Sequence, residues 1–170
     1  MPYQIIEHED LYLEQLGYIK SFIDEMSSTN LVIIGDFNAN LGPTGTKLFT
    51  NHLIDFCNEH DLIISSKVLL PSDSYSYVSS REGVFHYSWL DHVVSSRDFH
   101  KCIEEVNILT DMSHEYHIPI TIDLNIISLP NVTSESNDYT AKISWDNIKE
   151  CDISKYLNLT YLILTFQLKF

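Results

Sequence analysis

Apolar residues recur along the chain with two different spacings, which separate the expected helices from the expected strands. In residues 9–26 they recur at three- and four-residue steps, which is typical of an amphipathic helix. Residues 47–60 show the same spacing and predict a second helix. The polar run Ser27–Asn30 interrupts the first pattern, so we expect the first helix to end there.

Short apolar runs between and after these helices predict strands. Leu31–Ile34 is continuous and rich in β-branched residues, which is typical of a strand buried on both faces. The other expected strands are residues 62–64, strands near 75–77 and at 84–87 around a turn at 81–83, and residues 89–94, 103–109 and 118–122. Helices and strands together predict an α+β fold.

The composition changes after Leu129. Residues 130–140 are rich in Ser, Thr, Asn and Asp and predict a linker. Residues 145–158 predict a short helix, and the apolar run at 161–170 is shorter than the roughly 20 residues that cross a bilayer. We therefore expect a folded domain over residues 1–128 and a linker with a poorly structured tail over residues 129–170.

The net charge limits how the protein can bind nucleic acid. The 170 residues include 24 acidic residues against 10 lysines and arginines, a net charge of −14. Long-range attraction to phosphates needs a basic surface, so the composition excludes a general nucleic-acid coat protein. Any nucleic-acid chemistry requires a local site helped by a cation.

The ends and the cysteines favour an intracellular protein. Residues 1–20 mix charged and apolar positions and contain no apolar segment typical of a signal peptide. The three cysteines lie far apart without CxxC spacing, which argues against a disulfide framework. We expect a nuclear or cytoplasmic location, no secretion and no membrane partner.

Polar side chains directly follow the buried run at Leu31–Ile34. Asp36 and Asn38 are two residues apart, so in extended backbone they point to the same side. A carboxylate and an amide at the end of a strand can bind a cation, a water or a phosphate oxygen. The alternative is an Asx turn that closes the strand.

Two later segments carry an aspartate and a histidine. Strand alternation places Asp91 beside Trp89, and burying this carboxylate is costly unless it meets a partner such as an imidazole N–H. His117 heads an apolar strand, and a histidine held by an aspartate is the ordinary design of a general acid or base. The alternatives are a solvent-facing aspartate on an edge strand and a histidine of the core or its rim.

In this order and at these separations, the three motifs resemble the endonuclease/exonuclease/phosphatase superfamily, specifically the endonuclease domain of non-LTR retrotransposons. The resemblance extends from about Leu11 to Asn125 and depends on Ile33–Ala39 (IIGDFNA), Ser88–His92 (SWLDH) and His117–Ile120 (HIPI). It implies a partial two-sheet β-sandwich with flanking helices. It also implies that the chain corresponds to the C-terminal part of such a domain, with the N-terminal half missing.

The resemblance implies a metal-dependent phosphodiester hydrolase that acts on DNA. In the family, the residue matching Asp36 orients or deprotonates the attacking water, and we assign it the metal. The residue matching Asn38 contacts the phosphate. The match for Asp91 holds the catalytic histidine, here His117, which binds or protonates the region of the scissile phosphate. A divalent cation, Mg²⁺ or Mn²⁺, stabilises the developing charge, and no small-molecule cofactor is implied.

Two departures from the family pattern favour an alternative function. Tyr116 stands where the family has an aspartate next to the histidine. The missing N-terminal half supplies the principal metal-binding glutamate of the family. The alternative is therefore a non-catalytic interaction protein that associates through an exposed sheet face.

Two other readings start from the same residues. A phosphatase of the same superfamily, acting on a lipid or sugar phosphate, would use the same motifs. A zinc site could draw on several histidines, but their spacing is irregular and no cysteine pair assists them. These histidines are His86, His92, His114 and His117.

Overall fold

The computed structural model describes residues 8–25, 30–43, 47–112, 116–125 and 161–165. The predicted linker at 130–140 and the predicted helix at 145–158 lie outside these residues. Mixed helices and antiparallel sheets confirm the α+β class.

Two helices match the predicted ones closely. They are α1 (Glu9–Glu25) and α2 (Leu48–Glu59). Two shorter helices, α3 (Ser65–Leu69) and α4 (Arg97–His100), were not predicted, because four or five residues are too few to show a helical repeat. A 3₁₀ turn covers Thr110–Met112.

The strands of the described residues form three antiparallel sheets. The largest has the order β2-β5-β1-β8, and the two others are the hairpins β3-β4 and β6-β7. The bounds are β1 (Leu31–Asp36), β2 (Leu62–Ile64), β3 (Tyr77–Arg81), β4 (Val84–Ser88), β5 (Asp91–Ser96), β6 (Ile103–Ile108), β7 (Ile120–Leu124) and β8 (Tyr161–Thr165). All except β8 were predicted within a few residues.

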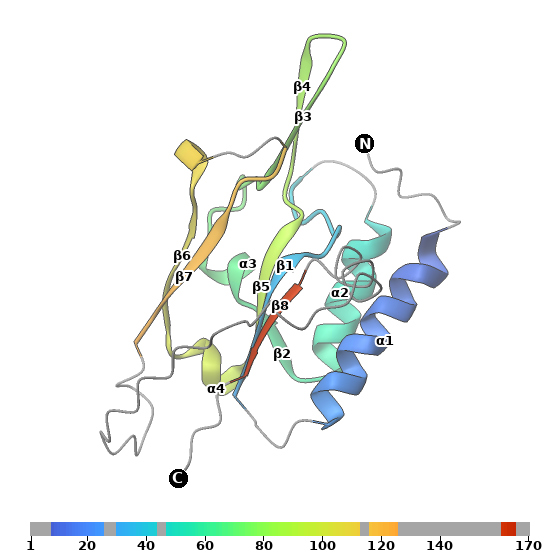
Figure 1. Cartoon of the computed structure of the whole chain (residues 1–170), viewed down its shortest axis with the longest axis vertical. Coiled ribbons are helices and arrows are strands. Elements are labelled where there is room, and N and C mark those ends of the chain that lie inside the picture. Colours follow the sequence, from blue (N-terminus) through green and yellow to red (C-terminus); the bar gives the residue numbers. More distant parts are fainter. Residues whose placement is uncertain (1–7, 26–29, 44–46, 113–115, 126–160, 166–170) are drawn as a thin grey trace, which may run out of the picture.

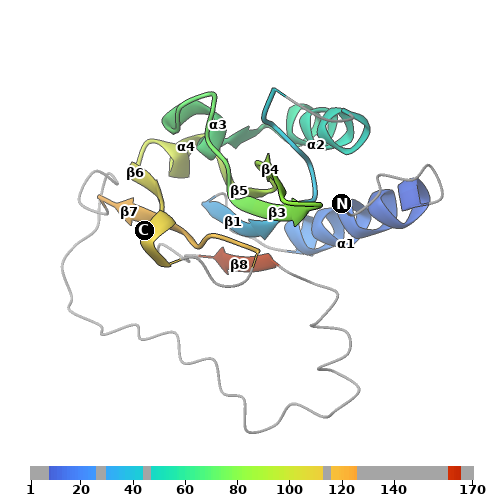
Figure 2. The same ribbon diagram turned by 90° about the horizontal axis from the view of Figure 1, so that it is seen from above.

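The four-stranded sheet lies between two other layers (Figures 1 and 2). Helices α1 and α2 cover one face, and Ile33 of β1 packs there in a buried cluster with residues such as Leu16 and Leu53. The hairpin β6-β7 and α4 cover the other face, where Val32 and Val93 are fully buried. Successive residues of β1 thus point to opposite layers, as a continuous apolar run predicts.

This packing corrects one expectation. A partial sandwich was expected to leave a sheet face uncovered, but Val32 and Val93 lie under the β6-β7 layer. Exposed apolar side chains lie on the helices α1 and α3 and on β4, which projects with β3 from one end of the molecule (Figure 1). Those on β4 are Val84, Phe85 and Tyr87. In the part of the chain that the structure describes, no helix has the length and apolar character needed to cross a membrane.

Candidate active site

Three segments converge at one end of the four-stranded sheet. Strands β1 and β5 are antiparallel neighbours, and Asp36 at the end of β1 pairs with Asp91 at the start of β5. His117 reaches the same place through an isolated bridge to Tyr77, the first residue of β3. The hydrogen bond from the Ile118 N–H to the Ser76 carbonyl, 2.7 Å long, fixes this attachment.

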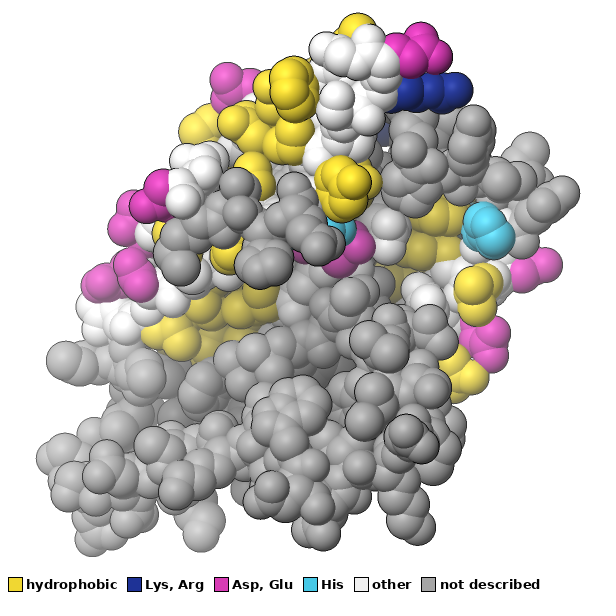
Figure 3. Space-filling model, turned by 45° about the horizontal axis from the view of Figure 1, so that its top comes forward, with side chains coloured by type: hydrophobic (Ala, Val, Ile, Leu, Met, Phe, Trp, Pro, Cys, Tyr) yellow, Lys and Arg dark blue, Asp and Glu magenta, His cyan; other side chains and the backbone are white. Residues whose placement is uncertain are grey.

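The imidazole of His117 lies between two carboxylates. Its Nδ1 is 3.1 Å from Oδ2 of Asp91, and its Nε2 is 3.9 Å from Oδ2 of Asp36. The side chain of His117 is 44% exposed, whereas those of Asp36 and Asp91 are 15% and 13% exposed. The ring is therefore open to solvent on one side and flanked by two largely buried acids. In Figure 3, histidine and acidic side chains meet among hydrophobic ones on the face shown.

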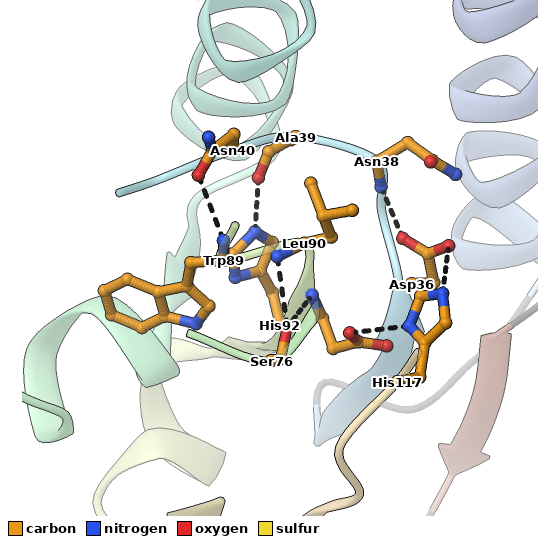
Figure 4. Close-up of polar contacts among 10 residues, drawn as sticks. Asp36, Asn38, Ala39, Asn40, Ser76, Trp89, Leu90, His92 and His117 are labelled. Carbon is orange, nitrogen blue, oxygen red and sulfur yellow. Dashed lines mark hydrogen bonds and ion pairs between the residues drawn. The ribbon is translucent and has the colours of Figure 1, made fainter. Parts of the chain in front are cut away.

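The backbone at Asn38 follows the second of the two interpretations drawn from the sequence. Its φ of 51° is left-handed, so the expectation of extended backbone from Asp36 to Asn38 is wrong. The backbone N–H of Asn38 donates to Oδ1 of Asp36 at 2.8 Å, which is the Asx turn named as the alternative. Asp36 consequently lies between Asn38 and His117 (Figure 4).

The surroundings shift both titrating groups upward. Burial raises the pKa of the Asp36 carboxyl to about 6, and the charge of Asp91 adds to the rise, while hydrogen bonds from Asn38 and the nearby His117 oppose it. The hydrogen bond to Asp91 raises the pKa of the His117 imidazole against the opposing effect of burial. Above pH 6 Asp36 is mainly ionised, and the raised pKa of His117 extends its protonated form to higher pH than in a free histidine.

Three buried polar residues support this arrangement, and sequence reasoning gave none of them this role. The Ser76 hydroxyl accepts hydrogen bonds from the N–H groups of Leu90 and Asp91, at 3.1 and 2.9 Å. The other two are Asn40 and His92, which join the turn after β1 to the same segment. Their contacts depend on how distant strands pair, so no local sequence pattern could have revealed them.

The described histidines of the proposed zinc site lie in different surroundings. His92 is fully buried against Ala39, His86 is exposed on β4, and His114 lies outside the described residues. Within the described ranges, no group of three or more His, Cys, Asp or Glu side chains is arranged to hold a metal ion. Tyr116, which replaces the expected aspartate, is 57% exposed, and its ring centroid lies 6.2 Å from that of Tyr77.

The turn after β1 is tightly packed at Gly42. A Cβ there would lie 3.0 Å from Oδ1 of Asn40, which already accepts the Gly42 N–H. We expect Gly42→Ala to destabilise the protein by about 1–2 kcal/mol in urea denaturation, because it strains a buried hydrogen bond. In contrast, Gly17→Ala in α1, where nothing lies within 4 Å, should stabilise by about 1 kcal/mol. Equal effects of the two substitutions would contradict this description of the turn.

Comparison with known proteins adds no relative. No protein-family model matches the chain, and no curated protein matches it. The site is therefore defined by its geometry: an acid–imidazole pair, a second buried carboxylate with a raised pKa, and a turn that fixes that carboxylate.

Proposed function

We propose that the protein is a metal-dependent phosphodiester hydrolase of the endonuclease/exonuclease/phosphatase type, with DNA as its substrate. The observation that carries the proposal is the Asp91–His117 pair facing Asp36 at the end of the sheet. These groups come from segments far apart in the chain, and each was expected to contribute to this chemistry. Aspartates are mostly exposed in proteins, and buried carboxylates cluster at functional sites, so two largely buried carboxylates beside a histidine support a functional role.

The arrangement suits the transfer of protons on the two sides of a phosphodiester. The ionised Asp36 would accept the proton of a water whose oxygen attacks phosphorus. A protonated His117 would donate to the oxygen that leaves as the second P–O bond breaks. Asp91 would hold the imidazole in orientation and stabilise its charge.

A divalent cation fits the donor set beside this pair. Mg²⁺ commonly uses one or two carboxylates together with waters and substrate phosphates. Asp36 would hold the ion, because one of its oxygens accepts the Asn38 N–H and the other faces the site. The ion would supply positive charge next to the phosphate, which an acidic protein lacks over most of its surface.

A plasmid-nicking assay tests the proposal. With Mg²⁺ or Mn²⁺ the native chain is expected to nick supercoiled DNA, and a chelator should abolish this activity. Asp36→Ala should lower the rate by about 10²-fold or more, since it removes both the proton acceptor and the ligand for the ion. Asp123→Ala, which replaces an exposed aspartate on β7, is the matched control and should leave the rate unchanged. Equal rates for native protein and Asp36→Ala would refute the assignment.

A non-catalytic interaction protein is the second candidate, and Tyr116 is the observation that favours it. The family pattern has a carboxylate at this position, whereas a phenol is neutral at pH 7. If the native chain does not nick DNA with either metal, we test Tyr116→Asp. Nicking by this variant would show that the residues of the site remain competent and that Tyr116 accounts for the loss.

A further inference from the structure

The turn after β1 is joined to the start of β5 by two buried side chains, Asn40 and His92, which we call the clamp. Asn40 is 6% exposed and His92 is fully buried. Oδ1 of Asn40 accepts the N–H groups of Gly42 and Trp89, each at 3.0 Å. Nε2 of His92 lies 2.6 Å from the carbonyl oxygen of Ala39 (Figure 4). The clamp thus connects two segments that are about fifty residues apart in sequence.

The hydrogen bonds of His92 define its tautomer. The Ala39 carbonyl can only accept, so the proton must be on Nε2, and Nδ1 faces the Ser66 hydroxyl at 3.5 Å. Burial lowers the pKa of the His92 imidazole to about 4, which leaves the ring neutral at pH 7. His92 is therefore a neutral donor in a fixed orientation rather than an acid or a base.

The hydrogen bond between His92 and Ala39 joins residues that are next in sequence to residues of the candidate site. Ala39 follows Asn38, whose N–H holds the carboxylate of Asp36. His92 follows Asp91, whose carboxylate holds His117. The His92–Ala39 hydrogen bond therefore joins the turn that fixes one acid to the strand that carries the other. It acts beside the Asn40–Trp89 bond and two backbone bonds that link the turn to Trp89 and Leu90.

We propose that His92 is a positioning residue, whose Nε2–H holds the Ala39 carbonyl so that Asp36 keeps its place opposite His117. This inference depends on the proposed function for its catalytic meaning, but its geometric part does not. The ring contacts the Ala39 carbonyl, the Ser66 hydroxyl and the rings of Phe37 and Trp89. Displacing a reacting group by about 1 Å can cost about 10²-fold in rate, so a lost clamp should reduce turnover more than substrate binding.

Two substitutions separate the donor from the packing. His92→Leu removes the N–H and keeps an apolar side chain, whereas His92→Gln retains an amide N–H that can reach Ala39. We measure amide hydrogen exchange at Asn38 relative to Val32, which reports opening of β1 as a whole. His92→Leu should accelerate exchange at Asn38 about tenfold more than at Val32, and His92→Gln should keep the native ratio. In the nicking assay, His92→Leu should lower kcat about 10²-fold with KM nearly unchanged.

A control and a measurement on the native chain complete the test. Ser95→Ala removes a buried hydroxyl of β5 that bonds Ser65 at 2.7 Å, and it should accelerate exchange at Asn38 and Val32 equally. In the labelled native protein, a scalar coupling across the hydrogen bond between His92 Nε2 and the Ala39 carbonyl is expected. This measurement requires no variant, so it tests the hydrogen bond between His92 and Ala39 even if His92→Leu does not fold.

The outcomes distinguish this inference from the proposed function. Absence of the coupling, or equal acceleration at Asn38 and Val32 in His92→Leu, would overturn the positioning role. A native protein that shows the coupling and the selective acceleration but nicks no DNA would retain the clamp and contradict the hydrolase. An unchanged kcat in a His92→Leu protein that shows selective acceleration would overturn the catalytic part of the inference.

Discussion

Replacing His117 with alanine is expected to lower the rate of DNA nicking by about 10²–10⁴-fold, the usual contribution of a general acid or base. The imidazole is the group that faces both carboxylates, at 3.1 Å from Asp91 and 3.9 Å from Asp36. Single-turnover nicking at saturating Mg²⁺ measures the effect. His60→Ala, at the C-terminal end of α2, is the control and should leave the rate unchanged. A His117→Ala protein as fast as the control would remove the histidine from the mechanism.

The pH dependence of the rate provides an independent check on His117. Activity should rise with pH as Asp36 ionises, below its metal-free pKa of about 6 because a bound cation favours the carboxylate, and it should fall at higher pH as His117 loses its proton. The hydrogen bond to Asp91 is the main cause of the raised His117 pKa. Asp91→Asn should therefore shift the alkaline limb to lower pH. The acidic limb should move less in the same direction, because the charge of Asp91 is only one contribution to the raised pKa of Asp36. An alkaline limb that stays in place would contradict this assignment.

Neutralising Asp36 is expected to stabilise the fold by about 3 kcal/mol at pH 7.5. Burial raises the pKa of this carboxyl from 3.8 to about 6, so ionisation costs free energy in the folded state. The stability that the protonated group contributes is complete below pH 3.8 and is lost as the pH rises through 6. Asp36→Asn removes this loss and keeps an oxygen that can accept the Asn38 N–H.

Urea denaturation at two pH values measures this effect. The gain from Asp36→Asn should be large at pH 7.5 and below about 1 kcal/mol at pH 4, which lies close to the unfolded pKa of 3.8 and far below the folded pKa of about 6. Asp123→Asn on the exposed face of β7 should change stability little at either pH. A destabilised Asp36→Asn protein at pH 7.5 would show that the carboxylate is held for structure. A stabilised one would indicate a charge kept at a cost in stability, as is common at functional sites.

Much of the fold follows from periodicity in the sequence, whereas the meeting of the site residues does not. The continuous run at Leu31–Ile34 predicts a strand between two layers, because each successive side chain must find an apolar neighbour. Nothing local indicates that Asp91 should meet His117, which is 26 residues away. That pairing was expected from the family resemblance. It depends on two long-range contacts: β5 pairs with β1, and His117 bridges to Tyr77 at the start of β3.

The incorrect expectations have physical causes. Two-residue alternation holds only while the backbone is extended, and it fails at Asn38 because the chain turns there to satisfy an N–H of its own. The polar partners Asn40, Ser76 and His92 look like ordinary loop or strand residues in the sequence. They are recognisable only as acceptors or donors for backbone groups that folding buries.

The left-handed backbone at Asn38 restricts which residues can occupy that position. Asparagine and glycine adopt this conformation readily, whereas alanine pays roughly 1–2 kcal/mol for its Cβ. Loss of activity in an alanine variant would therefore mix a distorted turn with a missing amide. Glycine is the informative replacement, since it deletes the side chain and lets the main chain keep its left-handed conformation without strain.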